Sequence, residues 1–294
     1  MAFRKILCPT DFSPGSHHAM LQAARLAREA DAELVLAHAW HLPPTAYAEL
    51  AFPADAVQSM LDDAERRLAA SAAEVRRLDI SRVTTQLLTG VPWDQIVELL
   101  RRDPAFGIAV LGTRGRSGLD RVLLGSVAEK VVRHAPCPVL TVPDRGQVSA
   151  FKDILCPVDF SESSRNAVAL AAEIAASRGS RITLLHVIEL PIAYSGEPPI
   201  EGLLADLDKR AAALLEEWAR SLGTKLSQPV VTRSRIGYPG AQILSVLDKD
   251  ATFDLVVMGS HGRTGLRRML LGSVAEKVVR HACCPVLVAH ARTL

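Results

Sequence analysis

The sequence lacks three features that would point directly to a partner or a location. It has no run of about 18 apolar residues, which a membrane-spanning helix would need. It has no large excess of either charge, because 34 Lys and Arg residues oppose 32 Asp and Glu residues, a net charge of +2, and residues 1–147 hold 17 of each kind. Proteins that bind nucleic acids usually concentrate basic residues on one face. The composition therefore predicts neither a membrane nor a nucleic acid as partner.

The third missing feature is a disulfide framework. The chain has five cysteines, an odd number, and its first residues reach Pro9 and Asp11 too early for the apolar segment of a secretory signal. Four cysteines recur at matching places in the two halves, as Cys8 with Cys156 and Cys137 with Cys284. We expect these in core strands. The adjacent Cys283 and Cys284 could form a redox pair, but we expect both to be inert buried thiols, because only His281 lies near enough in sequence to lower a thiol pKa. These features predict a reducing, cytoplasmic location.

What the sequence does contain is a repeat. The segment 112–140, GTRGRSGLDRVLLGSVAEKVVRHAPCPVL, returns 147 residues later at 259–287 as GSHGRTGLRRMLLGSVAEKVVRHACCPVL. A period of half the chain predicts two domains, each large enough to bury its own core. We place domain 1 at residues 1–143, a linker at 144–150 and domain 2 at 151–294.

Short apolar runs alternate with longer amphipathic segments in both halves. The strands expected in the first half are RKILCP, ELVLAHAW, VTTQLL, FGIAVLG and PVLTV, and those in the second are DILCPV, RITLLHVI, PVVTRSRI, FDLVVMG and PVLVA. Helices are expected between them, in the first half at 13–30, 55–78, 92–102 and 126–134. Strands that alternate with helices of this length predict an α/β fold with parallel sheets.

Serine marks the expected start of several helices. Ser13, which is followed by proline, and Ser161 at the matching place are typical N-caps. The Ser-x-x-Glu spacing of a capping box, in which the serine caps the helix, begins at Ser126 and again at Ser273. All four serines are therefore expected to serve as caps.

One motif in the repeat carries chemistry. The spacing Gly-x2-Gly-x9-Gly-Ser follows an apolar strand in each half, as Gly112, Gly115, Gly125 and Ser126 and again as Gly259, Gly262, Gly272 and Ser273. Glycine lets backbone N–H groups approach an anion, and a helix N-terminus favours negative charge. The motif follows a strand at the carboxyl edge of the expected sheet, where α/β folds bind ligands. We predict a phosphate-binding site in each half, to which the serine hydroxyls add donors.

Other interpretations of these residues stay open. The glycines could serve only as turns and the serines only as caps. A Walker-type site and a dinucleotide site are disfavoured, because the Walker motif is absent and no Gly-x-Gly-x-x-Gly follows the first strand. An acid follows the first strand of each half, Asp11 and Asp159. Each carboxylate could accept hydrogen bonds from a ribose, help to hold a divalent cation, or only fix the adjacent turn. His38 and His186 have no further ligands at metal-binding spacing, and we expect them to be packed.

At these residues the sequence resembles the tandem universal stress proteins, in the subset whose glycine motif accompanies ATP binding. The likeness covers essentially the whole chain and includes ILCPTDFS and ILCPVDFS at the starts of the halves and PVL at their ends. It implies two tandem open-sheet domains, each a five-stranded parallel sheet of order 3-2-1-4-5 with helices on both faces. It also implies that the final strands of the two sheets pair antiparallel in an internal pseudo-dimer. A further homo-oligomer is left open.

The resemblance also implies which residues hold the nucleotide. In domain 1 they are Asp11 for the nucleoside, Ala39 for adenine through its backbone, and Gly112, Gly115, Gly125 and Ser126 for the phosphates. In domain 2 they are Asp159, Val187, Gly259, Gly262, Gly272 and Ser273. Arg116 and Arg263 follow the second glycine and either donate to a phosphate or face solvent. Chemistry adds an expected Mg²⁺ ion between the phosphates, with no protein ligand assigned to it.

The two halves differ inside and outside this motif. Residues 113–114 are Thr-Arg where residues 260–261 are Ser-His, so the two sites are expected to differ in affinity. Gly107 stands where the second half has Asp254, about 16 Å from the motif at roughly 3.3 Å per residue of strand. This change is expected to weaken domain 1 without touching the phosphates.

We therefore expect a cytoplasmic stress-response protein that binds ATP in one or both domains and acts as a nucleotide-dependent regulatory or signalling module. Segments 41–54 and 189–202 differ most between the halves and are expected to be surface loops that pass the signal to an unidentified protein. One alternative is a slow ATPase or phosphotransfer enzyme, although the sequence shows no positioned acid–base pair and no catalytic residue is predicted. A second is a structural stress protein without nucleotide.

Overall fold

The computed structural model describes residues 3–41, 54–113, 115, 124–144, 147–189, 201–223, 226–262 and 271–290. The chain divides into two compact units, one ending at Val148 and the next starting at Ser149. The carbonyl oxygen of Val148 accepts a hydrogen bond from Arg25 at 3.4 Å, whereas the Ser149 hydroxyl donates to the carbonyl oxygen of Asp254 at 2.6 Å. The chain thus leaves one unit and enters the other within residues 144–150.

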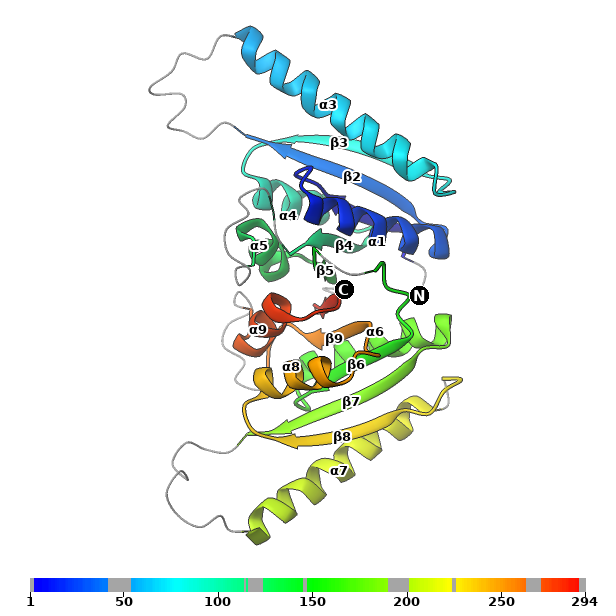
Figure 1. Ribbon diagram of the computed structural model, residues 1–294, viewed down its shortest axis with the longest axis vertical. Helices are drawn as coiled ribbons and strands as arrows, with labels where there is room; N and C mark the ends of the chain where they lie inside the picture. The colour runs from blue at the N-terminus through cyan, green and yellow to red at the C-terminus, as the bar shows by residue number, and fades with distance from the viewer. Residues whose placement is uncertain are drawn as a thin grey trace, which may run out of the picture. The chain divides into compact units, whose positions relative to one another are not determined.

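Both domains alternate strands and helices along the chain (Figure 1). Domain 1 consists of β1 (Lys5–Pro9), α1 (Pro14–Ala30), β2 (Glu33–Trp40), α3 (Ala54–Arg76), β3 (Val83–Thr89), α4 (Pro92–Arg102), β4 (Phe106–Gly112), α5 (Ser126–His134) and β5 (Val139–Val142). Domain 2 consists of β6 (Asp153–Val158), α6 (Glu162–Arg178), β7 (Arg181–Ile188), α7 (Glu201–Gly223), β8 (Val231–Ile236), α8 (Pro239–Lys249), β9 (Leu255–Gly259), α9 (Ser273–His281) and β10 (Val286–Ala289).

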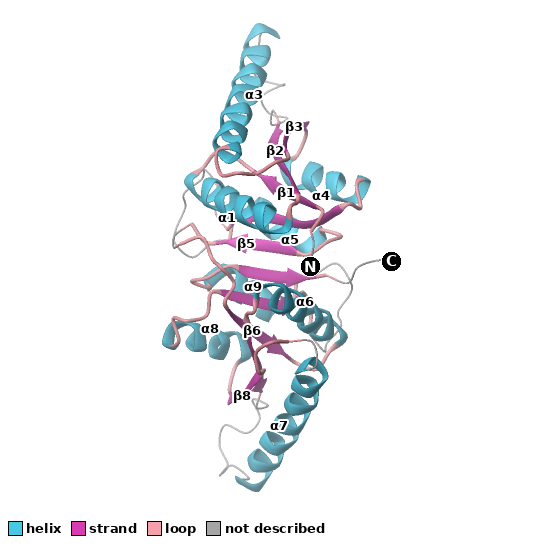
Figure 2. Cartoon of the chain, turned by 90° about the vertical axis from the view of Figure 1, so that its right-hand side faces the viewer, coloured by secondary structure: helices cyan, strands magenta, loops and turns pink. Residues whose placement is uncertain are grey.

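The predicted α/β fold and strand order are confirmed in each domain. The strands of domain 1 are parallel and lie in the order β3-β2-β1-β4-β5. Those of domain 2 are parallel in the order β8-β7-β6-β9-β10. Helices α1 and α3 contact one another and α4 contacts α5, while α8 contacts α9 in domain 2. Helices accordingly flank the strands of each sheet on both sides (Figure 2).

The central strands are buried on both faces, as parallel strands covered by helices must be. In β1, Ile6, Leu7 and Cys8 expose none of their surface, and in β6 Leu155 and Cys156 are equally buried. Burial raises the pKa of both thiols to about 12, because the thiolate would lose its hydration. These two cysteines are therefore the inert core residues that the repeat predicts.

The expectation that Cys283 is buried is wrong. Cys284 is buried, but Cys283 is exposed in the turn between α9 and β10. A hydrogen bond from the Cys284 thiol lowers the pKa of Cys283 to about 6. The turn carries Cys283 where domain 1 has Pro136, and a turn position does not share the burial of the strand that follows it.

The N-caps predicted for α1 and α6 are confirmed. The Ser13 hydroxyl accepts a hydrogen bond from the amide of Ser16 at 3.2 Å, and the Ser161 hydroxyl accepts one from the amide of Ser164 at 3.2 Å. Each bond satisfies an amide that has no partner within its helix. The starts of α1 and α6 are therefore fixed locally by the sequence after β1 and β6.

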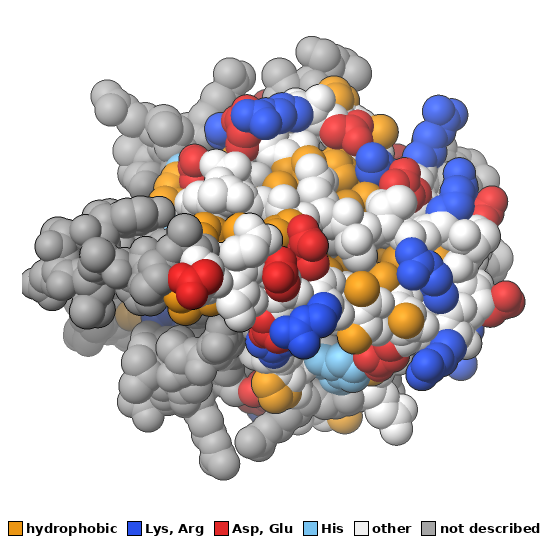
Figure 3. All heavy atoms as spheres, turned by 90° about the horizontal axis from the view of Figure 1, so that it is seen from above, with side chains coloured by type: hydrophobic (Ala, Val, Ile, Leu, Met, Phe, Trp, Pro, Cys, Tyr) orange, Lys and Arg blue, Asp and Glu red, His pale blue; other side chains and the backbone are white. Residues whose placement is uncertain are grey.

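Two further observations concern the surface. No helix of the described residues is long and apolar enough to cross a membrane. On the face in Figure 3, acidic and basic side chains are interspersed rather than gathered by sign. The antiparallel pairing of the final strands in a pseudo-dimer stays a prediction.

Candidate functional site

The strand order places the candidate site at a topological switch point. In domain 1, β1 pairs with β2 on one side and β4 on the other, so the chain reverses direction across the sheet between β1 and β4. Asp11 follows β1 and Gly112 ends β4, so both lie at the carboxyl edge beside this point. In domain 2, Asp159 and Gly259 occupy the same places beside β6 and β9. Ligands of open α/β sheets bind in this crevice.

The first glycine of each motif packs against the helix that follows the acid. A Cβ on Gly112 would lie 2.7 Å from the carbonyl oxygen of Gly15 and 3.1 Å from the amide nitrogen of Ser16. A Cβ on Gly259 would overlap the side chain of Ser163 and lie 2.9 Å from its carbonyl carbon. No side chain fits at either place, so glycine is required for the close approach of β4 to α1 and of β9 to α6.

The second glycine of each motif lies against the acid. A Cβ on Gly115 would lie 2.7 Å from Oδ2 of Asp11, and a Cβ on Gly262 would lie 2.8 Å from Oδ2 of Asp159. The glycine loop and the carboxylate, which are about a hundred residues apart in the sequence, therefore line one crevice. This juxtaposition was expected from the resemblance and is present in both domains.

A backbone hydrogen bond closes the loop between the second and third glycines. The amide of Gly125 donates to the carbonyl oxygen of Thr113 at 2.8 Å, and the amide of Gly272 donates to that of Ser260 at 2.8 Å. The third glycine of each motif thus lies against the residue that follows the first glycine. The start of α5 or α9 is thereby placed beside the first part of its motif, where a phosphate could meet both.

The predicted capping boxes at α5 and α9 are wrong. The N-cap residues are Gly125 and Gly272, and neither helix has a side-chain cap hydrogen bond. Because the amide of the N-cap glycine closes the loop, the serine becomes the first helical residue. Ser126 and Ser273 are exposed, and Glu129 instead pairs with Arg133 at 2.8 Å. The serine hydroxyls are therefore not used as caps.

Each acid also fixes the turn beside it. Oδ1 of Asp11 accepts hydrogen bonds from the amide and hydroxyl of Ser13 at 3.1 and 2.5 Å. Oδ1 of Asp159 accepts the same two bonds from Ser161 at 3.1 and 2.6 Å. Each acid therefore does fix the adjacent turn, which was one of the roles left open by the sequence. It does so through Oδ1, the oxygen that faces away from the motif glycine. Oδ2 is the oxygen directed toward the crevice.

Sequence reasoning missed the serine that lies three residues after each N-cap, Ser16 in α1 and Ser164 in α6. The hydroxyl of Ser16 lies 3.0 Å from the hydroxyl of Thr10, whereas that of Ser164 donates to Oδ1 of Asp159. The difference follows from Val158, which stands at the place of Thr10 and offers no hydroxyl. The Ser-x-x-Ser spacing in both halves was the available signal. Two serine hydroxyls therefore donate to Asp159, whereas one serine hydroxyl donates to Asp11.

A histidine and a phenylalanine support each turn from behind. Nδ1 of His38 lies 2.7 Å from the carbonyl oxygen of Thr10, and its ring lies 4.5 Å from that of Phe12. His186 makes the same contacts with Val158 and Phe160. Both phenylalanines have positive φ, 62° and 66°, which costs energy in a bulky residue and recurs at functional turns. The packed role expected for both histidines is confirmed.

The residues expected near adenine lie on the neighbouring strand. Ala39 pairs with Leu88 at the end of β2, and Val187 pairs with Arg235 at the end of β7. Because β2 lies on the far side of β1 from β4, Ala39 is two strand spacings, or about 10 Å, from the strand of Gly112. A nucleoside triphosphate can bridge this span with its base at one end and its phosphates at the other.

Arg116 and Arg263, the candidate phosphate donors, lie outside the described residues. Within them, His261 in the second motif has Nδ1 2.8 Å from the Ser260 hydroxyl, and its buried Nε2 has no hydrogen-bond partner. No group of three or more potential metal ligands occurs in the described parts of the chain. The two loops thus differ chemically at residues 113–114 and 260–261.

Comparison with known proteins agrees with this geometry. The model of the universal stress protein family matches residues 2–143 and 150–290. The chain belongs to this family. It carries two universal stress protein domains in tandem, and membership assigns the protein to the stress response.

Two mycobacterial relatives match most or nearly all of the chain. A universal stress protein of Mycobacterium tuberculosis is 32% identical over 241 residues, which cover 78% of this chain and 77% of the relative. One of Mycolicibacterium smegmatis is 29% identical over 297 residues, which cover 98% of this chain and 97% of the relative. The crystal structure of a universal stress protein from Archaeoglobus fulgidus covers 99% of this chain with a TM-score of 0.72 and 23% identity. That structure supports the fold alone.

Proposed function

We propose that each domain of this universal stress protein binds ATP at the carboxyl edge of its sheet, and that the protein acts as a nucleotide-dependent regulatory or signalling module in the cytoplasm. The observation that carries the proposal is the closed glycine loop lying against the acid. The amide of the third glycine closes the loop, and the second glycine contacts the carboxylate. A turn made only for connection would not need this contact.

The geometry suggests how the nucleotide would lie. The phosphates would meet the loop from Gly112 to Gly115 and the N-terminus of α5, where helix amides favour negative charge. The exposed hydroxyl of Ser126 would donate to a terminal phosphate. Oδ2 of Asp11 would accept a hydrogen bond from the ribose, and the backbone at Ala39 would meet adenine. Domain 2 offers the same groups.

Mg²⁺ is expected to accompany ATP, since it usually binds phosphates with few protein ligands. Hydrolysis needs a base to position the attacking water. One oxygen of each carboxylate already accepts hydrogen bonds, two on Asp11 and three on Asp159, so the carboxylate is poorly placed for that role. We therefore propose a binding protein rather than an enzyme. The segments proposed to contact a signalling partner, 41–54 and 189–202, lie almost entirely outside the described residues.

The experiment is to identify the nucleotide that co-purifies with the protein and then to titrate the stripped protein with ATP and Mg²⁺ by calorimetry. Gly115→Val and Gly262→Val each place a side chain against the carboxylate rather than against backbone, so they should abolish one site without unfolding the domain. Gly202→Ala is the control, because a Cβ there meets nothing within 4 Å.

Two binding events in the parent protein, with one lost in each valine variant, would support the proposal. The absence of both co-purified nucleotide and binding heat at millimolar ATP would overturn it and favour a structural stress protein. Turnover above a trace that disappears in Gly262→Val would instead identify a slow ATPase.

A further inference from the structure

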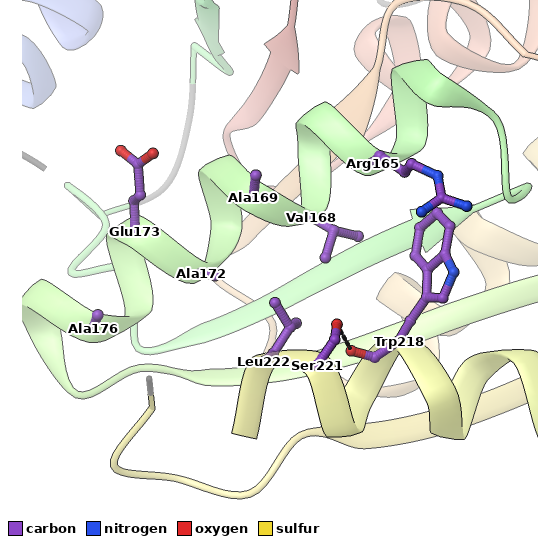
Figure 4. Close-up of a pocket in the computed structure, with 9 residues that line it drawn as sticks. All are labelled: Arg165, Val168, Ala169, Ala172, Glu173, Ala176, Trp218, Ser221 and Leu222. Atoms are coloured by element: carbon purple, nitrogen blue, oxygen red, sulfur yellow. Dashed lines mark hydrogen bonds between the residues drawn. The ribbon is translucent and has the colours of Figure 1, made fainter. Parts of the chain in front are cut away.

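Domain 2 has an open groove between α6 and α7, on a different side of α6 from the nucleotide crevice. The cavity has a volume of about 400 Å³, within the range of small-molecule sites. Val168, Ala172 and Leu222 line it and are buried. Arg165 and Trp218 stand together at one end, as Figure 4 shows. The groove is therefore apolar along its length and cationic at one end.

The same place in domain 1 is occupied by larger and paired side chains. Leu21 stands where domain 2 has Ala169, and Arg28 stands where it has Ala176. Across the two helices, Nε2 of His17 lies 2.8 Å from Oε1 of Glu74. His17 corresponds to Arg165, and Glu74 corresponds to Ser221, whose hydroxyl donates to the carbonyl oxygen of Trp218 at 2.6 Å instead. Several of the side chains that shape this groove are thus particular to domain 2 and do not recur at the matching places of domain 1.

Arg165 supplies a positive charge at one end of the groove. Its guanidinium lies 5.0 Å from the centre of the Trp218 ring, and the side chain is exposed. Among the described residues it makes no ion pair. A guanidinium stacked on an aromatic ring is held in place and keeps its N–H groups for a carboxylate. The charge at this end of the groove therefore complements an anion.

The length of the apolar part limits the ligand. Ala169 and Ala176 are seven residues apart on α6, which spans about 10 Å at ~1.5 Å per residue. Glu173, on the rim of the groove, disfavours a second negative charge. The ligand that fits has one anionic group and an unbranched apolar body of this length. We propose that the groove binds a medium-chain monocarboxylate, such as a fatty acid, with its carboxylate at Arg165 and its chain along Ala172 and Leu222.

The test is calorimetric titration of the full-length protein with octanoate and with 1-octanol, which has the same chain without the charge. We expect the parent protein to bind octanoate at least about tenfold more tightly than octanol, as a charge-assisted hydrogen bond predicts. Arg165→Gln should lower octanoate affinity about tenfold and leave octanol affinity unchanged. Arg77→Gln, which removes an exposed charge from domain 1, should change neither.

A second variant tests the cavity. Ala169→Leu introduces the residue that domain 1 carries at this place, on an exposed position, and should weaken both ligands at least about tenfold. Circular dichroism and thermal melting check that each variant is folded. The proposal is overturned if the parent shows no octanoate binding at millimolar concentration, if Arg165→Gln keeps the preference for octanoate, or if folded Ala169→Leu binds like the parent. Nucleotide titration of the same variants should be unchanged, which separates this site from the ATP site.

Discussion

The two domains share the crevice and differ in what surrounds it. In both, the second motif glycine meets an acid and the third closes the loop through its amide. Behind the crevice, Thr10 of domain 1 is replaced by Val158, and on the helix side the bridge from His17 to Glu74 is replaced by an open groove. The contacts that are repeated are those that a phosphate ligand would need. The contacts that differ could give each copy a separate role.

At the opposite edge of the sheet, the two domains carry one ion pair with its charges reversed. In domain 1, Lys5 at the start of β1 lies 2.8 Å from Asp103 and 3.7 Å from Glu33. In domain 2, the place of Lys5 is taken by Asp153, which pairs with Arg181 at 2.6 Å. The Lys5–Glu33 pair is thus kept with both signs reversed, whereas Asp103 corresponds to Asp250, which keeps its sign and pairs with Arg233 at 3.3 Å. Packing at this edge therefore requires an ion pair and not a particular residue.

The largest expected effect comes from adding a methyl group to the first motif glycine. Gly112→Ala should destabilise domain 1 by about 3 kcal/mol or more, because the new Cβ meets the backbone of Gly15, which cannot rotate away. Gly259→Ala should have a similar effect on domain 2. Denaturant unfolding of the whole protein checks this. If either variant loses less than about 1 kcal/mol of unfolding free energy, β4 or β9 can move away from its helix. The two crevices would then not be built in the same way.

The next effect separates the domains. Oδ1 and Oδ2 of Asp254 accept hydrogen bonds from the amides of Asp153 and Lys152 at 2.9 and 3.0 Å. Asp254→Ala should therefore destabilise domain 2 by about 2 kcal/mol, since two amides lose a charged acceptor. Domain 1 has Gly107 at this place, where a Cβ would lie 3.0 Å from the ring of Phe3. Gly107→Asp should therefore destabilise domain 1, because the new side chain would clash with Phe3 before it could accept hydrogen bonds as Asp254 does. Thermal unfolding of both variants measures the contrast.

A smaller effect should appear in binding alone. Because Ser126 and Ser273 do not cap their helices, Ser126→Ala and Ser273→Ala should change the free energy of unfolding by less than about 0.5 kcal/mol. Each should weaken ATP at its own site about tenfold if the hydroxyl donates to a phosphate. Calorimetry with ATP and Mg²⁺ measures the affinity. If the variants unfold more easily but bind ATP like the parent protein, the two serines have a structural role and do not contact the phosphates.

The fold could be predicted from the sequence because the alternation of apolar strand segments with amphipathic helix segments is the same in both halves of the repeat. Parallel strands such as β1 appear as short apolar runs, and Ser13 marks a helix start by a local bond. It failed at Ser126, where a capping box competes with a backbone bond from Gly125 to Thr113 that only the folded loop can form. It also missed Ser164, whose acceptor depends on the residue at position 158. Errors of this kind arise where a local pattern is overridden by contacts between distant segments.

The smallest effect is a dependence on pH that differs between the domains. The hydrogen bond to Asp103 raises the pKa of Lys5 above its ordinary value near 10.5, and the same bond lowers the pKa of Asp103 below its ordinary value near 3.8. The Lys5 contribution is therefore present below pH 10.5 and is lost as pH rises through the raised pKa. The Asp103 contribution is present above pH 3.8 and is lost as pH falls through the lowered pKa. Both side chains are partly exposed, so each contribution should stay below about 1 kcal/mol.

In domain 2 the basic partner at this edge is Arg181, which stays protonated at alkaline pH. As pH rises above 10.5 and through the raised pKa of Lys5, domain 1 should lose slightly more stability than domain 2, and Asp103→Asn should remove the difference because Lys5 then loses its main partner. Amide hydrogen exchange of β1 and β6 resolves the two domains in one sample. The prediction is wrong if both domains of the parent protein lose the same stability as pH rises, or if Asp103→Asn leaves the difference between the domains unchanged. The reversed ion pair would then have no effect on the pH dependence of stability.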